Sequence, residues 1–160
     1  IYGYSNWQYG CCNRLDNPTP VPLEVISPGP SIDFNILTYR PIVLSRKAAD
    51  LLRELLSEDQ AQFIRADIEG VKGHWQVLNV LDRVDCLDQE KSFIRYHDED
   101  HPSKPGKPRS VERLILDPDK ARGHDMFRLA DWEVAVIVSE RIKRAMQEAE
   151  ITGVEYWPTF

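Results

Sequence analysis

The chain has 160 residues, which fits one domain large enough to bury its own core. Its 20 basic and 26 acidic residues give a net charge of −6. This charge argues against generic binding to nucleic acid or to an anionic membrane, where a basic surface supplies the attraction. No run of residues approaches the ~18 apolar positions of a membrane-spanning helix. We therefore expect a soluble protein with no nucleic acid and no membrane as partner.

The three cysteines, Cys11, Cys12 and Cys86, do not indicate a disulfide framework. Their number is odd, and the adjacent Cys11 and Cys12 have poor geometry for pairing with each other. No secretory signature is recognisable, although the chain begins at Ile1 rather than at a methionine. These features favour a reducing compartment, and we expect a cytoplasmic protein.

The first 30 residues combine an aromatic stretch with a proline-rich one. Residues 1–12 contain Tyr2, Tyr4, Trp7 and Tyr9, which we interpret as packing on the core or a sheet edge in preference to a binding face. Residues 18–30 contain five prolines, which exclude a helix and a central strand. We predict an extended loop here. Recognition by an aromatic-lined groove is the less favoured alternative.

Residues 36–68 read as a strand, a helix and a returning strand. The apolar run up to Leu44 predicts a buried strand, and Ser45 is the type of residue that caps a helix N-terminus. The helix after it has an apolar stripe at helical spacing, formed by Ala48, Leu51, Leu52 and Leu55. Residues 62–68 are predicted to return as a strand.

The middle of the chain predicts a central strand over 75–81, because this run is nearly all apolar. Asp82, Asp85 and Asp88 then recur every third residue. They could be paired carboxylates for acid–base chemistry, but no histidine, serine or lysine nucleophile is identifiable beside them. We favour a polar helical turn, with Asp88 capping a turn through its side chain. Residues 93–96 are predicted to form a short strand.

Residues 97–110 are predicted to form a loop, since prolines and a glycine interrupt them and their charge changes from acidic to basic. His97 and His101 enclose Asp98, Glu99 and Asp100, a set that could ligate a divalent metal. A His-x-x-x-His pair forms a zinc motif when it lies on a helix, and the prolines that follow argue against a helix. We therefore predict neither a metal site nor another cofactor here. The alternative role is an acidic protrusion that engages a basic partner.

The end of the chain repeats the strand–serine–helix pattern. A strand is predicted over 111–116 and another over 133–138. Ser139 is the predicted cap of a helix whose stripe is Ile142, Ala145, Met146 and Ala149. Gly153 suits a left-handed cap at the helix C-terminus, and residues 154–157 are predicted to form a closing strand.

The two serines do not read as nucleophiles. A nucleophile elbow needs small residues on both sides, as in Gly-x-Ser-x-Gly, and neither Ser45 nor Ser139 has a glycine nearby. The chain also has no glycine-rich phosphate loop and no Cys-x-x-Cys pair. A capped scaffold with long charged loops and no catalytic set is typical of a protein that acts by binding another protein.

Three segments carry a resemblance to a known family. They are residues 75–88 (WQVLNVLDRVDCLD), residues 127–129 with 136–140 (FRL and VIVSE), and residues 151–156 (ITGVEY). In this order they resemble the Imm11-type immunity proteins of bacterial polymorphic toxin systems, over residues 36–160 and most strongly near the end. One departure is Tyr156-Trp157-Pro158, where the family is expected to have phenylalanine and a short apolar end.

The resemblance implies a non-enzymatic protein that binds and neutralises a cognate toxin, whose surface would be basic if charge guides the encounter. The fold we predict is α+β, a mixed sheet with two strand–Ser-capped helix–strand units, in a single domain (1–160) with an N-terminal segment (1–35) and a core (36–160). The alternatives are a small metal-dependent hydrolase built on His97 and His101, and a homo-oligomeric scaffold that uses the aromatic N-terminus. The residues expected to contact the partner are Asp85, Asp88, His97, Asp98, Glu99, Asp100, His101 and Lys104.

Overall fold

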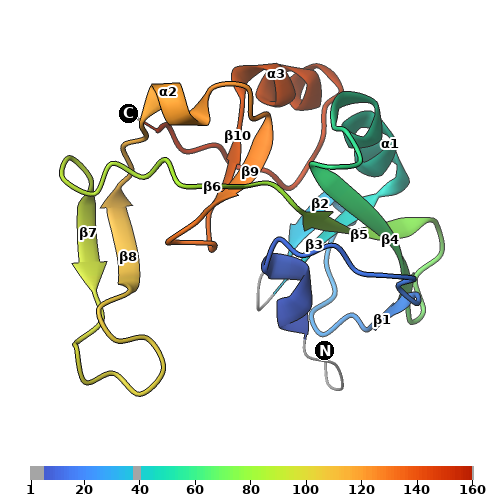
Figure 1. The fold of residues 1–160 in the computed structure, drawn as a ribbon. Coiled ribbons are helices and arrows are strands. Elements are labelled where there is room, and N and C mark those ends of the chain that lie inside the picture. Colours follow the sequence, from blue (N-terminus) through green and yellow to red (C-terminus); the bar gives the residue numbers. More distant parts are fainter. Residues whose placement is uncertain (1–5, 38–40, 160) are drawn as a thin grey trace.

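The computed structural model describes residues 6–37 and 41–159. The strands form three sheets, and the three α-helices lie along one side of the molecule as drawn in Figure 1, which confirms the predicted α+β class. None of the helices in these ranges is long and apolar enough to cross a membrane. The elements in chain order are η1 (Asn6–Gly10), β1 (Val21–Leu23), β2 (Phe34–Ile36), β3 (Ile42–Ser45), α1 (Arg46–Leu55), β4 (Ala61–Ile68), β5 (Trp75–Val80), β6 (Arg83–Val84), β7 (Phe93–Tyr96), β8 (Pro108–Arg113), α2 (Pro118–Ala121), β9 (Met126–Leu129), β10 (Val136–Val138) and α3 (Glu140–Glu148).

The largest sheet has five strands in the order β1-β4-β5-β3-β2. Strand β5 lies in the centre, as its apolar sequence predicts. Strands β3 and β4 are both antiparallel to β5, so they run parallel to each other with β5 between them, and α1 connects them. The first predicted strand–helix–strand unit is therefore present, with a third strand inserted between its two strands.

The N-terminal segment belongs to this sheet. Strand β1 pairs in parallel with β4 at the sheet edge, where Pro22 is tolerated because an edge strand leaves one side of its backbone unpaired. The predicted proline-rich loop thus contains a short edge strand. Tyr9 is buried, at 6% exposure, against Val43, Ile64 and Val77 on one face of the sheet, together with Val21, Leu23 and Leu15.

Polar contacts hold the same segment in place. Gln62 exchanges two hydrogen bonds with the backbone of Leu15, at 3.1 Å and 2.8 Å, and the buried Asn79 donates to the carbonyl of Asn13 at 2.8 Å. Core packing of the aromatic stretch is therefore seen for Tyr9. Tyr2, Tyr4 and the side chain of Trp7 lie outside the part of the chain that the structure describes.

The second sheet, in the order β10-β9-β6, lies beside a two-stranded hairpin of β7 and β8. Two predictions are corrected here. The segment with Asp82, Asp85 and Asp88 is extended and not a helical turn, because β6 pairs in parallel with β9 and Leu87 bridges Leu116. Strand β8 covers 108–113 and not 111–116, because its partner β7 ends opposite Pro108.

The second predicted unit lacks its closing strand. Residues 154–157 have the apolar and aromatic composition of a strand but pair with no other strand among the described residues. The C-terminus of α3 also differs, because the left-handed residue directly after the Ala149 cap is Glu150 (φ 50°) and not Gly153. Gly153 has φ +88° and allows the chain to approach β2 closely, since a Cβ there would lie 2.4 Å from the carbonyl oxygen of Phe34.

Helices α1 and α3 pack against each other over one core. Ala48 and Leu52 of α1 and Ile142 and Met146 of α3 are buried in a cluster that also contains Leu78 of β5. Lys47 Nζ donates to the carbonyl of Glu150 at 3.2 Å, and Arg141 donates to the carbonyl of Leu55 at 2.8 Å. Each helix therefore has its N-terminus beside the C-terminus of the other, and the predicted apolar stripes face one shared core.

Candidate partner-binding surface

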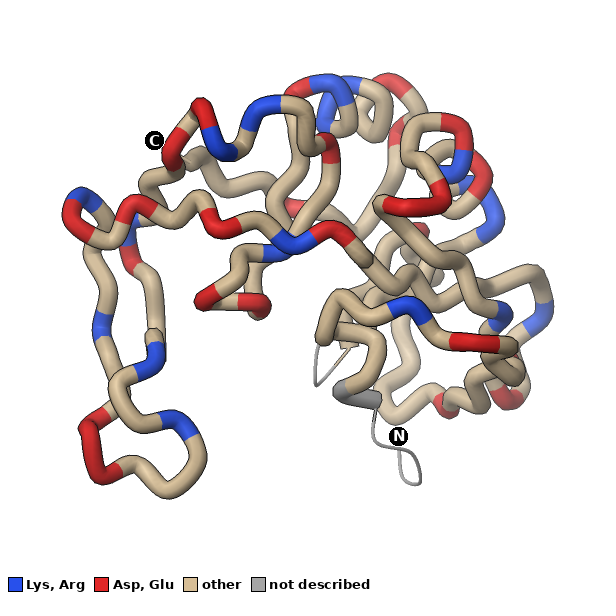
Figure 2. Tube along the Cα trace, in the orientation of Figure 1, with Lys and Arg blue, Asp and Glu red and all other residues tan. Residues whose placement is uncertain are grey.

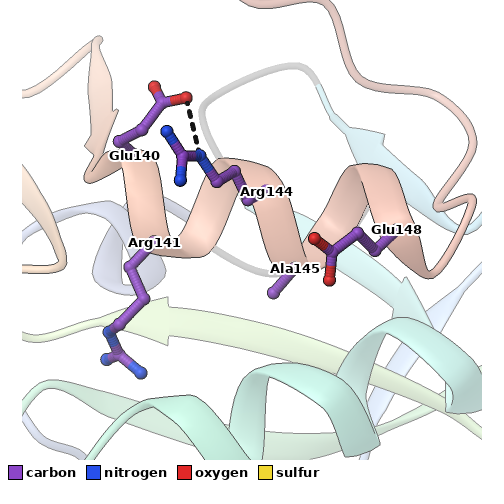
Figure 3. Close-up of a pocket in the computed structure, with 5 residues that line it drawn as sticks. All are labelled: Glu140, Arg141, Arg144, Ala145 and Glu148. Atoms are coloured by element: carbon purple, nitrogen blue, oxygen red, sulfur yellow. Dashed lines mark hydrogen bonds and ion pairs between the residues drawn. The ribbon is translucent and has the colours of Figure 1, made fainter.

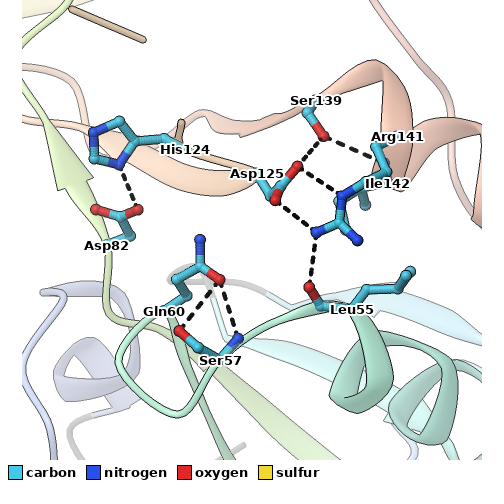
Figure 4. A network of polar contacts seen from close by, with 9 residues as sticks. All are labelled: Leu55, Ser57, Gln60, Asp82, His124, Asp125, Ser139, Arg141 and Ile142. Carbon is cyan, nitrogen blue, oxygen red and sulfur yellow. Dashed lines mark hydrogen bonds and ion pairs between the residues drawn. The ribbon is translucent and has the colours of Figure 1, made fainter. Parts of the chain in front are cut away.

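Ser45 and Ser139 occupy the N-cap positions of α1 and α3. Their hydroxyls accept from the backbone N–H of Ala48 and Ile142, each at 3.3 Å. The same hydroxyls donate to Asp33 and Asp125, each at 2.6 Å (Figure 4 shows the second pair). Each serine hydroxyl therefore donates one hydrogen bond and accepts another within the protein. This is the structural role of a helix N-cap, and it leaves neither hydroxyl available as a nucleophile.

The β7–β8 hairpin (residues 93–113) stands apart from the helices and from the five-stranded sheet, with β7 on its outer side (Figure 1). Its base is anchored in two ways. Ile94 packs on a core cluster with Phe127 and Leu129. Asp88 donates its N–H to the carbonyl of Ile115 at 3.0 Å, and Ser92 Oγ both donates to and accepts from the backbone of Ile115. The base of the hairpin is therefore anchored to the core cluster of the second sheet, and the rest of the hairpin projects from it.

The tip of the hairpin, residues 97–107, has its own internal bonds. His97 N–H donates to the carbonyl of Lys107 at 2.9 Å, and His101 N–H donates to that of Asp98 at 3.0 Å. His101 Nδ1 accepts from the N–H groups of Ser103 and Lys104, at 3.4 Å and 3.2 Å. Three prolines, Pro102, Pro105 and Pro108, restrict the backbone further. The tip is therefore a turn held by hydrogen bonds among its own residues.

The two histidines face each other in this turn. Their ring centroids are 4.3 Å apart, and partial burial together with the neighbouring His101 and Lys104 lowers the pKa of His97. Because Nδ1 of His101 already accepts from two backbone N–H groups, the ring has one nitrogen left for any other ligand. Within residues 6–37 and 41–159, no three His, Cys, Asp or Glu side chains are grouped as a metal would require.

The structure separates the predicted contact residues into two groups. Asp98, Glu99, Asp100, His101 and Lys104 lie together in the tip with His97. Asp85 and Asp88 lie at the base, at the opposite end of β7, where Asp88 bonds Ile115. The Asp88 carboxylate accepts from Lys91 N–H at 3.0 Å and from Lys91 Nζ at 2.8 Å, and these bonds lower its pKa. Asp88 therefore caps a turn, whereas Asp85 remains exposed.

Two exposed aromatic residues on the hairpin were missed by sequence reasoning. Phe93 is 55% exposed and Tyr96 is 46% exposed, and both belong to β7. The sequence contained a signal, because a four-residue strand between a polar turn and a charged loop has few neighbours to cover its aromatic side chains. Burial cannot be read from the pattern alone, so both residues looked like ordinary strand residues.

A histidine does lie beside one of the aspartates. His124 Nδ1 is 2.7 Å from Asp82 Oδ2, across 42 residues of sequence (Figure 4). The His124 ring packs edge-on to Phe127. An Asp–His pair can serve as a general base when a nucleophile lies next to it. In the described part of the chain no serine, threonine, cysteine or lysine side chain bonds His124. The pair links the start of β6 to the turn before β9.

A groove of about 460 Å³ runs along α3. Its lining is mainly charged, and Figure 3 shows Arg141 and Ala145 on the side of the helix that faces α1. Glu140 pairs with Lys143 and Arg144, while Arg141 bonds Asp125 and the end of α1. Glu140, Arg141 and Arg144 are therefore used in ion pairs and hydrogen bonds within the protein, and the groove does not present the few convergent polar groups that ligand sites share.

Comparison with protein-family models gives a match to the Immunity protein family (Imm11) over residues 33–159. The comparison with curated proteins gives no match. The matched range begins at Asp33, the residue that bonds the first helix cap, and contains both capped helices and the whole β7–β8 hairpin. Because the match covers most of the chain, this protein belongs to the Imm11 family of immunity proteins.

Proposed function

We propose that this protein protects the cell that makes it by binding and neutralising a cognate toxin of a polymorphic toxin system. The observation that carries the proposal is the family match over residues 33–159. We further propose that it acts in the cytoplasm without enzymatic activity and without a cofactor, and that its partner is a protein and neither nucleic acid nor a membrane.

The geometry supports binding as the mode of action. A hairpin with exposed aromatic residues projects from the body, and polar groups elsewhere that could suggest catalysis are used for structure: both serines cap helices, and Asp88 caps a turn. The net charge of −6 would speed the encounter with a basic toxin. An interface of ~800 Å² per partner, with its energy concentrated in a few anchors, would suffice.

The direct test is expression of the protein together with the toxin whose gene lies beside its own. We expect growth to be restored and the two purified proteins to elute as one complex in size-exclusion chromatography. A toxin from an unrelated system serves as the control and should not be neutralised. If the neighbouring toxin remains fully toxic and no complex forms, the proposed function is wrong.

The metal-dependent hydrolase and the scaffold remain as outcomes of two simpler measurements. Stoichiometric zinc or manganese in the purified protein, lost together with an activity in His97→Ala/His101→Ala, would favour the hydrolase. A concentration-dependent oligomer in light scattering, with no toxin bound, would favour the scaffold.

A further inference from the structure

We propose that the outer limb of the β7–β8 hairpin, residues 93–100, is the surface that docks on the toxin. In this proposal the toxin contacts Phe93 and Tyr96, which lie three residues apart on β7, and presents cationic side chains to Asp98, Glu99 and Asp100. The inference rests on the proposed function, because it names the surface through which the neutralising complex forms.

The first argument is the exposure of two aromatic side chains on one strand. Phe93 and Tyr96 expose about half of their surface, although their neighbour Ile94 packs on the core with Leu129. The fold therefore uses Ile94 and leaves Phe93 and Tyr96 in solvent. Large aromatic residues of this kind are the commonest anchors of protein–protein interfaces, because they bury much apolar area with few rotatable bonds.

The second argument concerns charge. Some exposed acidic side chains in this molecule have a basic partner, for example Asp67 with Arg65 and Glu112 with Arg95. Asp98, Glu99 and Asp100 form no ion pair within the residues that the structure describes, although Lys104 and Lys107 belong to the same tip. At the tip of the hairpin, Figure 2 shows acidic residues on the side away from the body and basic residues on the side nearer to it. Three carboxylates without an ion pair, next to two exposed aromatic residues, fit a partner that presents lysine or arginine beside apolar surface.

The third argument is the rigidity of the tip. The backbone bonds His97–Lys107 and His101–Asp98, and the acceptance of two N–H groups by His101, hold the turn before any partner arrives. A loop that is already ordered loses less conformational entropy on binding than a flexible one. The internal hydrogen bonds of the tip therefore favour its use as a preformed contact surface.

The inner limb suggests the competing occupant, a second copy of this chain. Lys104, Lys107 and Arg109 could pair with the acids of a neighbouring hairpin around a two-fold axis. We favour the toxin because the family is one of immunity proteins and because both aromatic anchors belong to β7, on the acidic outer limb.

The experiment measures the affinity of the full chain for an inactive variant of the neighbouring toxin by biolayer interferometry. Two variants change the proposed surface: Phe93→Ser/Tyr96→Ser, and Asp98→Lys/Glu99→Lys/Asp100→Lys. We expect the aromatic variant to raise Kd by roughly 100-fold or more. The charge variant should lower the association rate by about tenfold at low salt and by less at high salt.

Two matched controls change other surfaces by the same chemistry. Val25→Ser/Ile26→Ser removes two apolar side chains exposed elsewhere, and Glu54→Lys/Glu58→Lys/Asp59→Lys makes the same charge change near the end of α1. Both should bind the toxin within about twofold of the wild type, and all variants should unfold at the wild-type temperature because every changed side chain is exposed.

Three results would overturn the inference. If the wild type binds and both hairpin variants bind like the controls, the docking surface lies elsewhere while the proposed function stands. If sedimentation shows a wild-type dimer that only the hairpin variants abolish, with toxin binding unchanged, the hairpin serves a second copy of the chain. If the wild type binds no toxin, the proposed function and the inference fail together.

Discussion

Asp33 and Asp125 begin two hairpin–helix units of the same design. In the first unit (residues 33–55), Asp33 precedes β2, β2 pairs with β3, and Ser45 caps α1; in the second (residues 125–148), Asp125 precedes β9, β9 pairs with β10, and Ser139 caps α3. The registers correspond, because the residue after each aspartate pairs with the residue before each serine: Phe34 with Leu44, and Met126 with Val138.

The two aspartates differ in their remaining partners. The other carboxylate oxygen of Asp33 accepts from Thr152 N–H at 3.1 Å and Thr152 Oγ1 at 2.9 Å. Asp125 instead accepts from Arg141, whose shortest contact is 2.6 Å. Neutral donors therefore hold the first unit, and an ion pair holds the second. The comparison teaches that one local design can be completed by different tertiary contacts.

The surroundings of the two sheets differ as well. In the first unit's sheet, the apolar cluster on one face includes Tyr9, Val21 and Leu23, which precede the family-matched range. In the second unit's sheet, the cluster includes Val84 and Leu87 from within that range. The following predictions test how far the two units are equivalent, beginning with the largest expected effect.

Removal of residues 1–32 should unfold the first unit's sheet. The deletion takes away β1 and exposes Val43, Ile64 and Val77; burial of three large side chains is worth about 5 kcal/mol or more, a large part of a domain's stability. Hydrogen exchange should show loss of protection in β3 and β4 before β9. A truncated chain as stable as the full one would show that this segment is dispensable.

Gly153→Ala should destabilise the protein strongly, by about 3 kcal/mol or more. Its φ is +88°, and the new Cβ would lie 2.4 Å from the Phe34 carbonyl oxygen. Gly123→Ala is the matched control, because its φ is +87° but nothing lies within 4 Å, so only the cost of the left-handed backbone, about 1 kcal/mol, applies. Urea denaturation of both variants measures the difference in the free energy of unfolding. Equal costs would mean that the close approach of Gly153 to β2 does not contribute to the effect.

Asp33→Ala and Asp125→Ala should each cost about 1–3 kcal/mol at low salt, since each removes a charged acceptor of several hydrogen bonds. In 1 M NaCl the cost of Asp125→Ala should fall, because the partly exposed ion pair with Arg141 is screened. The cost of Asp33→Ala should change less, because its hydrogen-bond partners are hydroxyl and backbone N–H groups and only the nearby charge of Lys47 is screened. The same salt dependence for both would contradict the distinction between the two units.

The two aspartates should also make stability depend on pH. Burial raises the pKa of Asp33, but hydrogen bonds from Ser45 and Thr152 outweigh it, and the pKa lies below its ordinary value of 3.8. Hydrogen bonds from Arg141, and to a lesser degree from Ser139, lower the pKa of Asp125. Since both folded-state pKa values are depressed, their stabilisation is present above about pH 4 and is lost as pH falls through the folded values. Acid titration of unfolding should be shallower in Asp33→Asn/Asp125→Asn than in the wild type, and an unchanged slope would refute this.

Ser45→Ala and Ser139→Ala should have the smallest effects, about 1 kcal/mol each, because each removes one N-cap. The two costs should agree, since the capping distances are the same. Thermal unfolding followed by circular dichroism measures both, with Ser45→Thr and Ser139→Thr as variants that keep a hydroxyl. A clearly larger cost in one unit would show that its serine does more than cap a helix.

Local patterns in the sequence were enough to predict much of this fold. A serine before an amphipathic run sets a helix N-terminus by bonds to residues three positions away, and the apolar stripes of α1 and α3 follow from the helical repeat. The apolar run of β5 predicted a central strand, because a strand without a polar face has no side to leave in water. These features depend on neighbours along the chain, so no tertiary knowledge was needed.

Other features had local signals that the tertiary structure overrode. Residues 154–157 have a strand-like composition but pair with no strand in the described part of the chain, because a strand exists only where another backbone offers its hydrogen bonds. Gly153 looked like a helix cap and is instead a point of close approach to β2. The acids at 82, 85 and 88 looked like a helical turn, and pairing with β9 and with Leu116 extends that segment.

By itself, the sequence determined the α+β class, the two capped helices, the central strand and the resemblance to the immunity family. Only the tertiary structure decided that Asp33 and Asp125 accept hydrogen bonds from the capping serines 12 and 14 residues away. It also decided that Tyr9 packs on one face of the five-stranded sheet and that Phe93 and Tyr96 remain exposed. The physical reason is range. Caps and stripes arise from bonds within one helical turn, whereas burial and long-range pairing depend on which surfaces the whole chain brings together.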